Sequence, residues 1–219
     1  MFKKFWNKNN IVSSNLHYYD RFVNQFNCKY VWKCSPDKIF NIYNQNCSKY
    51  HLEIGPGTGY FLKNSNLNST IRELTLIDIN DQILDYSMKN LKSEYSNINA
   101  LNYNLFTDKI PDHIKFDSVG INYVLHCIPG NLQKKIDTLI HNLGDNNYKL
   151  FASTVICDPL HISVIAEYEL MLLNSLGIFN NNNDTYQELQ EYLENNKFKY
   201  NLYKEGYVAI LEINTNKLL

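Results

Sequence analysis

The sequence predicts an α/β fold built on a mostly parallel, seven-stranded sheet with helices on both faces. Short apolar runs alternate with amphipathic stretches along most of the chain, which is typical of parallel strands joined by helices. The last two apolar runs instead flank Glu205-Gly206, which predicts an antiparallel hairpin at the C-terminal end. Two helix-like segments rich in Tyr, Phe and Trp precede residue 50, and we expect them to form an N-terminal helical cap.

Seven short apolar runs are the expected strands. The first is stopped by Gly55-Pro56-Gly57, and the fourth is rich in β-branched residues around Gly120. The strands are expected at residues 50–53, 73–78, 98–103, 116–122, 148–156, 199–203 and 207–214.

The helices expected between these strands carry apolar residues at helical spacing, as 132–143 does on one face. Asp81 is expected to cap the helix after the second strand, and Asp184 or Thr185 the helix before the hairpin. The helix expected over 161–176 is rich in Leu, Ile and Met, and the Leu/Met face of residues 165–176 is expected to belong to the core rather than to a substrate cavity. The asparagine run that ends at Asp184 is expected to be a surface loop.

Length and composition favour one globular domain and exclude several classes of function. A chain of 219 residues can bury a core without metals or disulfides. Its net charge of −1 and pI of about 6.6 leave no field to hold a polyanion. The five cysteines form no CxxC pair, which favours a reduced, cytoplasmic chain without a metal site. The start MFKKFWNKNN lacks the apolar centre of a signal peptide, and no run is long enough to span a membrane.

The stretch HLEIGPGTGYFL, which begins at His51, places three glycines directly after the first strand. Ligands of open α/β sheets bind at the carboxyl ends of strands, and glycine lets a ligand approach the backbone closely. A dinucleotide-binding turn would have glycine where Tyr60 stands, and a phosphate-binding loop would need Gly-Lys-Ser/Thr. Glu53 would repel a pyrophosphate and would suit an ammonium group. A plain tight turn is the alternative.

A second acid, Asp78, ends the second strand about twenty residues after the glycines, where an acid accepts hydrogen bonds from ribose hydroxyls. An adenosine ligand with no phosphate and a cationic amino-acid end is S-adenosylmethionine. The two acids and the glycine spacing therefore favour this cofactor.

The motif EIGPGTG, followed by LID after the next strand, resembles the class I S-adenosylmethionine-dependent methyltransferases, which have a Rossmann-like sheet. The resemblance runs from about Tyr18 to Asn214. YD at 19–20, WKC at 32–34 followed by a proline, INYVLHCIPG at 121–130 and GIF at 177–179 resemble small methyltransferases of microbial secondary metabolism. It implies one methyltransferase domain over 1–219, with a helical cap at 1–48, a cofactor-binding core at 49–158, a helical insertion at 159–196 and a hairpin at 197–219.

The resemblance also implies roles for individual residues. Asp78 would bind the ribose and Ile79 would pack on the adenine, which the loop at Asn104 and Leu105 would frame; many relatives have Asp where Asn104 stands. Lys33 is as readily a solvated surface charge. The methionine part would be held by Glu53, Gly55, Pro56, Gly57, Gly59 and Asn122, with Tyr19 and Lys33 closing over the cofactor and its carboxylate.

Methyl transfer from a sulfonium is an in-line displacement that needs mainly alignment in a dry site. A general base is required only where the acceptor must lose a proton. His126, just past the fourth strand, is the candidate base by position, and Tyr19 is a second candidate catalytic residue. A structural histidine is the more common alternative for His126. S-adenosylhomocysteine would be the product of the cofactor.

A small-molecule acceptor is favoured. The chain reads Asn122-Tyr123-Val124-Leu125 where DNA amino-methyltransferases carry Asn/Asp-Pro-Pro-Tyr/Phe. No basic stripe with interleaved aromatics indicates nucleic-acid binding. The aromatic cap and the insertion would enclose a small ligand. The alternatives are a methyltransferase acting on protein or tRNA and a non-catalytic S-adenosylmethionine-binding regulator; the oligomeric state stays open.

Overall fold

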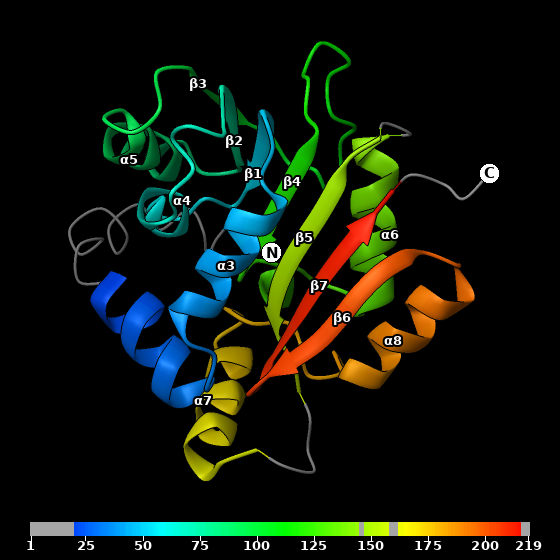
Figure 1. Cartoon of the computed structure of the whole chain (residues 1–219). Helices are drawn as coiled ribbons and strands as arrows, with labels where there is room; N and C mark the ends of the chain where they lie inside the picture. Colours follow the sequence, from blue (N-terminus) through cyan, green and yellow to red (C-terminus); the bar gives the residue numbers. More distant parts are fainter. Residues whose placement is uncertain (1–19, 145–146, 158–161, 216–219) are drawn as a thin grey trace.

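The computed structural model describes residues 20–144, 147–157 and 162–215. At its centre lies a sheet of seven strands in the order β3-β2-β1-β4-β5-β7-β6 (Figure 1). The strands are β1 Tyr50–Ile54, β2 Glu73–Asp78, β3 Ile98–Asn102, β4 Ser118–Asn122, β5 Lys149–Val155, β6 Lys199–Glu205 and β7 Val208–Asn214.

The first five strands are parallel, and β7 runs antiparallel to both β5 and β6. The predicted fold class, including the C-terminal hairpin, is therefore confirmed. The carboxyl ends of the parallel strands form the lower edge of the sheet in Figure 1. Because Val155 pairs with Val208, β7 begins at this same edge.

Helices cover both faces of the sheet. On one face, residues of η1, α3, α4, α5 and α7 share a core with Leu74, Phe151 and Ile210 of the strands. On the other face, α6 and α8 pack over Leu52, Val119 and Leu150 with the short helix η2. The helices are the π-helix η1 Asp20–Val31, α3 Pro36–Asn46, α4 Tyr60–Asn64, α5 Asp81–Leu91, the 3₁₀ helix η2 Leu125–Cys127, α6 Leu132–Leu143, α7 Val164–Ser175 and α8 Tyr186–Asn195.

Two predicted helix caps have different outcomes. Thr185 caps α8, since its side chain accepts the N–H of Glu188 at 3.1 Å. The prediction for α5 is wrong by one residue, because the Asn80 side chain accepts the N–H of Gln82 at 3.0 Å and Asp81 is the first residue of the helix.

The asparagine run is a loop, as predicted, and Asn182 and Asn183 are exposed, but the prediction that the run lies at the surface fails at two positions. Asn181 and Asp184 are buried, with exposed fractions of 0% and 1%. The Asn181 amide donates to the carbonyl of Val155 at 2.8 Å, and Asp184 forms a buried ion pair with Lys135 of α6 at 2.6 Å. These long-range partners satisfy polar side chains that composition alone places in solvent.

The prediction that the apolar face of 161–176 belongs to the core is correct only in part. Ala166 and Leu170 of α7 are buried, but an opposite strip of the helix is exposed. This α7 strip consists of Val164, Ile165, Tyr168, Met171, Leu172 and Leu176, each at least 41% exposed. In Figure 1, α7 lies beside η1 at the carboxyl edge, and the Asn27 amide of η1 donates to Glu169 of α7 at 2.6 Å. Both helices therefore belong to the end of the sheet where the glycine turn lies.

Candidate active site

The glycine turn connects the end of β1 to α4. Gly55, Gly57 and Gly59 all have positive φ, at 66°, 57° and 77°, which other residues adopt rarely. The N–H of Gly55 donates to the carbonyl of Ile77 on β2, and the N–H of Gly59 donates to that of Pro56, both at 2.8 Å. Glycine occurs at these positions because the chain must reverse sharply at the end of a buried strand.

The three glycines differ in what surrounds them. A Cβ on Gly55 would lie 2.5 Å from Val124, and one on Gly59 would lie 2.9 Å from Leu91. A Cβ on Gly57 would meet no atom of the described residues within 4 Å. Gly57 is therefore the point where bare backbone faces open space and a ligand can approach it.

The turn is held in place from outside. Ser87 and Asn90 of α5 donate to the carbonyls of Gly57 and Thr58, at 2.7 and 2.8 Å. The Thr58 hydroxyl donates to Asp20 at the start of η1 at 2.5 Å. The N-terminal cap is thus bonded directly to the turn.

Asp78 and Ile79 lie at the end of β2, next to the turn. The Asp78 carboxylate accepts the N–H of Asn80 at 2.9 Å, and burial raises its pKa to about 6. Ile79 is half exposed, although it is large and apolar. An acid and an exposed apolar side chain in this place suit a ribose and a flat ring, respectively.

The loop after β3 carries Asn104 and Leu105. The Asn104 side chain accepts the N–H of Phe106 at 3.0 Å, which fixes the start of the loop. The Leu105 side chain is 1% exposed and packs in the core over α6, while its carbonyl accepts the amide of Asn142 at 2.8 Å. The side chain of Leu105 therefore lies away from the edge, and only its backbone is placed to frame a ligand.

Glu53 is buried beneath the turn, and both of its carboxylate oxygens have protein partners. The Tyr43 hydroxyl of α3 donates to Oε1 at 2.5 Å, and Nε2 of His51 lies 3.0 Å from Oε2. A Cβ on Gly120 of β4 would overlap Oε2. The carboxylate thus occupies a fitted place between β1, β4 and α3.

Asn122 ends β4 with an unusual side chain. It is buried, and within the described part of the chain neither atom of its amide has a hydrogen-bond partner at normal geometry. Its register neighbour on β5 is Ser153, whose hydroxyl is likewise buried and unpartnered. The next residue, Tyr123, has a positive φ of 56°, a strained conformation for a bulky residue. Unpartnered buried polar groups and strain together mark this strand end as a place for a ligand.

Lys33 and Tyr19 are the candidates from the cap. Lys33 lies at the β6–β7 turn, where its Nζ is 5.3 Å from the centre of the Tyr207 ring. In the sheet order β7 is three places from β1, so the structure does not bring Lys33 to the glycine turn. Tyr19 lies outside the described residues.

His126 lies in η2 at the carboxyl edge, but it is buried. Its Nδ1 accepts the N–H of Val155 at 3.2 Å. Burial, assisted by the charge of Lys135, lowers the pKa of His126 to about 3. A neutral imidazole whose acceptor nitrogen is already bonded to backbone is a poor general base, and the geometry supports the structural alternative.

Two side chains around Glu53 escaped sequence reasoning. His51 stands two residues before Glu53 on a strand, and this spacing alone puts both side chains on one face. Tyr43 comes from α3, and no local pattern links it to β1. Tertiary packing alone brings it to Glu53.

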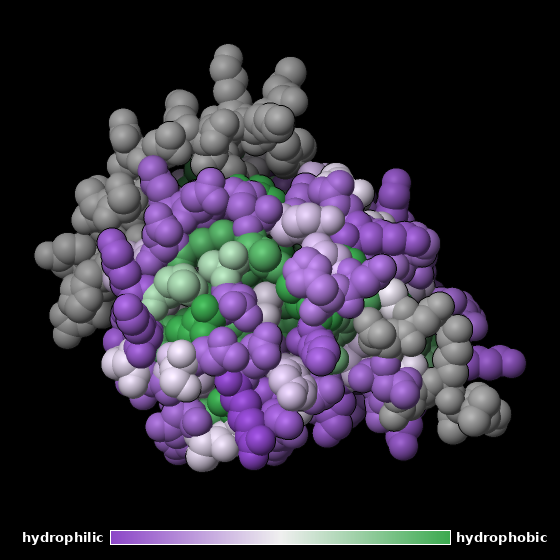
Figure 2. Space-filling view, turned by 90° about the horizontal axis from the view of Figure 1, so that it is seen from above, coloured by the Kyte–Doolittle hydropathy of each residue, from purple (hydrophilic) through white to green (hydrophobic). Residues whose placement is uncertain are grey.

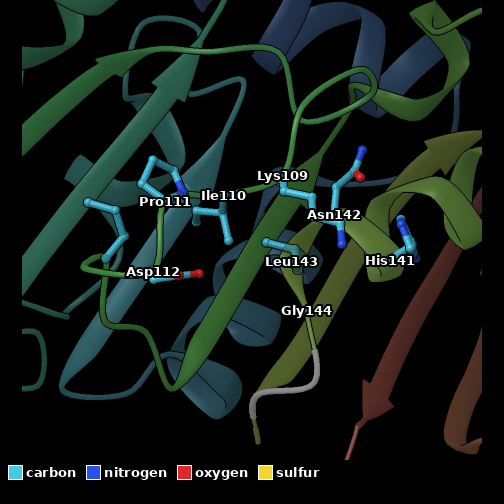
Figure 3. A pocket seen from close by; sticks show the side chains of 9 residues that line it. Lys109, Ile110, Pro111, Asp112, His141, Asn142, Leu143 and Gly144 are labelled. Carbon is cyan, nitrogen blue, oxygen red and sulfur yellow. The ribbon is translucent and has the colours of Figure 1, made fainter.

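A pocket of about 240 Å³ lies at the opposite, amino-end edge of the sheet, between the loop before β4 and the end of α6 (Figure 3). Figure 2 views the molecule from this side, where the surface is mainly hydrophilic around a hydrophobic area. The pocket is lined by Lys109, Ile110, Pro111, Asp112, Ile114, His141, Asn142, Leu143 and Gly144. It is separate from the glycine turn, which lies at the carboxyl edge.

The described residues contain no cluster of three or more His, Cys, Asp or Glu side chains placed to hold a metal ion. None of the helices in the described part of the chain combines the length and apolar character of a membrane span.

Comparisons with known proteins identify relatives of this chain. No family model matches it. It is 29% identical over 201 residues to demethylluteothin O-methyltransferase of Streptomyces thioluteus, covering 91% of this chain and 86% of the relative. It is 31% identical over 181 residues to methyltransferase aurB of Calcarisporium arbuscula, covering 76% of this chain and 78% of the relative.

The fold is shared with solved structures. A SAM-dependent methyltransferase from Aquifex aeolicus superposes with a TM-score of 0.57 at 14% identity, covering 88% of this chain and 95% of that one. Because the similarity to aurB extends over more than three quarters of both chains and the sheet has the same architecture as such enzymes, this protein belongs to the class I S-adenosylmethionine-dependent methyltransferases.

Proposed function

We propose that this methyltransferase acts on a small organic molecule, held at the carboxyl edge between the glycine turn and the roof made by η1 and α7. The observation that carries the proposal is the covering of this edge: η1 is bonded to the turn through Asp20 and to α7 through Asn27. A roof tied down at both ends suits an enclosed small ligand better than a polymer.

The residues at the edge fit the parts of S-adenosylmethionine. The open backbone at Gly57 would lie against the methionine part, and the unpartnered amide of Asn122 would gain hydrogen bonds from the same region. Asp78 would accept the ribose hydroxyls, and Ile79 would pack against the adenine. Loss of the methyl group would leave S-adenosylhomocysteine.

This chain contributes alignment and exclusion of water. The bound cofactor supplies a methyl group already activated by the positive sulfur. His126 holds the backbone of β5 and does not accept the acceptor's proton. With His126 unsuited to accept a proton, rate enhancement rests on orientation in a dry site.

The acceptor class is supported by one relative's name. Demethylluteothin O-methyltransferase is named for methyl transfer to the oxygen of a small molecule. A similar acceptor, with an oxygen or another nucleophilic atom on a compact organic scaffold, is the acceptor we propose here.

The test is a fractionation experiment. Purified protein is incubated with methyl-labelled S-adenosylmethionine and three fractions of an extract from cells that naturally contain the protein: low-mass metabolites, proteins and RNA. We expect label to enter the low-mass fraction, with release of S-adenosylhomocysteine. Label in protein or RNA instead would contradict a small-molecule acceptor. Binding of S-adenosylhomocysteine without turnover in every fraction would indicate a non-catalytic binding protein.

A further inference from the structure

A chain of buried polar groups runs along one face of β1 and β4 and ends at Glu53. The N–H of Ser48 donates to the Ser118 hydroxyl at 2.9 Å, and this oxygen lies 2.9 Å from Nδ1 of His51. Nε2 of His51 lies 3.0 Å from Glu53, whose other oxygen accepts from Tyr43. The network thus reaches from the amino end of β1 to the carboxylate below the glycine turn.

The hydrogen bonds assign the proton positions on His51. The Ser118 oxygen accepts from backbone, so its own hydrogen is available to Nδ1. Nε2 must carry a hydrogen to bond an ionised Glu53, and this holds for neutral and charged imidazole alike. In the described part of the chain no lysine or arginine pairs with Glu53, so His51 is the one basic side chain at its carboxylate.

The surroundings leave this pair little freedom. The His51 ring is 1% exposed and stacks on Phe151, with ring centres 5.7 Å apart and planes inclined by 14°. Opposite it, Gly120 is the register partner of Glu53, and any side chain there would overlap the carboxylate. The position of Glu53 is therefore fixed by packing and by two hydrogen bonds together.

We infer that His51 is a positioning residue that, with Tyr43, orients Glu53 toward the ammonium group of the cofactor's methionine end. The inference rests on the proposed function and goes beyond it, because it assigns the recognition of the amino-acid end to a buried network rather than to Glu53 alone. His51 does not touch the ligand. It acts by holding one carboxylate oxygen in place through a hydrogen bond.

The test uses two ligands that differ in the amino-acid end. S-adenosylhomocysteine has the ammonium group, whereas 5′-methylthioadenosine lacks the whole amino-acid part. Calorimetry measures the binding of both ligands by the wild type, His51→Phe, His51→Gln and Glu53→Gln. Phenylalanine keeps the stacking on Phe151 but cannot donate, and glutamine restores a donor near the place of Nε2.

We expect His51→Phe to lower the affinity for S-adenosylhomocysteine about tenfold and that for 5′-methylthioadenosine less than about twofold. His51→Gln should recover most of the loss. Glu53→Gln should show the same selectivity, and the double variant His51→Phe/Glu53→Gln should lose little more than Glu53→Gln alone. Equal losses for both ligands in His51→Phe would show a merely structural role and overturn the inference.

If His51→Phe does not fold, a second variant can still test the inference. Tyr43→Phe removes the other hydrogen bond to Glu53 and should show the same loss confined to S-adenosylhomocysteine. Its matched control is Tyr192→Phe, which removes a tyrosine–carboxylate bond to Asp137 on the opposite face of the sheet and should leave both affinities unchanged. Equal behaviour of the two tyrosine variants would overturn the inference. Failure of the wild type to bind S-adenosylhomocysteine would instead overturn the proposed function, and the inference with it.

Discussion

The carboxyl edge of the sheet has two halves that are assembled differently. The turn half, made of residues 53–59 and 78–79, takes its polar and flexible residues from the ends of two neighbouring strands. The other half lies around His126 and is called the roofed half below. It is assembled from η2, β5, α6 and the segment that ends at Asp184. Its side chains bond to residues distant in the sequence, as in the pair of Lys135 and Asp184, which are 49 positions apart.

The difference shows what each half tolerates. In the turn half we propose that the strained and charged groups serve a ligand, so substitutions there should change binding more than stability. In the roofed half the polar groups satisfy one another in the interior, so substitutions there should change stability first. Substitutions in both halves can break or sharpen this contrast.

The largest effect is expected from Lys135→Met. Nζ of Lys135 lies 2.6 Å from Asp184 and also donates to the carbonyl of Asn180 at 3.0 Å, with both charged side chains buried. Removing the cation leaves a buried carboxylate without its partner, and we expect a loss of about 3–5 kcal/mol in the free energy of unfolding, measured with urea. The double variant Lys135→Met/Asp184→Leu should regain most of this loss. A change below about 1 kcal/mol would show that the pair is not what closes the roofed half.

Asp78→Asn should lower the affinity for S-adenosylhomocysteine about 10- to 100-fold, because a charged acceptor of hydroxyl bonds is lost. Binding by the wild type should weaken as the pH falls through about 6, since only the ionised carboxyl accepts two hydroxyls. The same raised pKa means that the folded state binds the proton more tightly, so ionisation of Asp78 lowers stability as the pH rises from about 4 to 6. Asp78→Asn should therefore melt higher than the wild type at pH 7.5, and a lower melting temperature would contradict this account.

The glycines separate backbone strain from ligand contact. Gly55→Ala should cost about 2 kcal/mol of stability, because its Cβ meets Val124 and φ is positive. Gly57→Ala should cost about 1 kcal/mol for φ alone while lowering cofactor affinity roughly tenfold, since its methyl group enters the open space. Thermal melts and calorimetry on both variants measure the two quantities. If the two variants showed the same ratio of stability loss to affinity loss, the proposed difference between Gly55 and Gly57 would be contradicted.

His126→Asn should cost some stability at every pH, because the shorter side chain loses its packing on Phe179, but it should remove the additional loss of stability in acid. The pKa of His126 is lowered from 6.5 to about 3, so the unfolded chain binds the proton more readily and stability falls as the pH drops through this window. At pH 5 the wild type should lose roughly 1–2 kcal/mol of its free energy of unfolding in this way. The variant should not show this loss in acid, since asparagine does not titrate and keeps an acceptor for the Val155 N–H. Urea unfolding at pH 7.5 and pH 5 measures the difference. A matching acid loss in the variant would contradict burial of a neutral His126.

Local spacing in the sequence predicted the turn half well. The three glycines with positive φ, Asp78 at the end of β2 and the exposed Ile79 all lie where strand alternation places them. The mostly parallel sheet and its antiparallel hairpin at Glu205-Gly206 were predicted from the same alternation, whereas the order of the seven strands was not. The roles of these residues toward the cofactor stay predictions.

The roofed half could not be predicted in the same way. Asparagine and aspartate favour loops in general, so the segment before Thr185 was expected in solvent, whereas Asn181 is bonded to β5. Lys33 follows an aromatic residue of the cap, yet the tight approach of Gly206 takes it to the hairpin. Such placements depend on partners that are distant in the sequence, 26 residues away for Asn181 and more than a hundred for Lys33, and no periodicity encodes them.

The exposed α7 strip has a practical consequence for work with the purified protein. The chain carries a net charge of only −1, and its pI is about 6.6. Near neutral pH there is thus little electrostatic repulsion to prevent the α7 strips of two molecules from associating at high concentration. Storage buffers above pH 8, or a trace of mild detergent, should keep the preparation clear where a neutral buffer turns it cloudy.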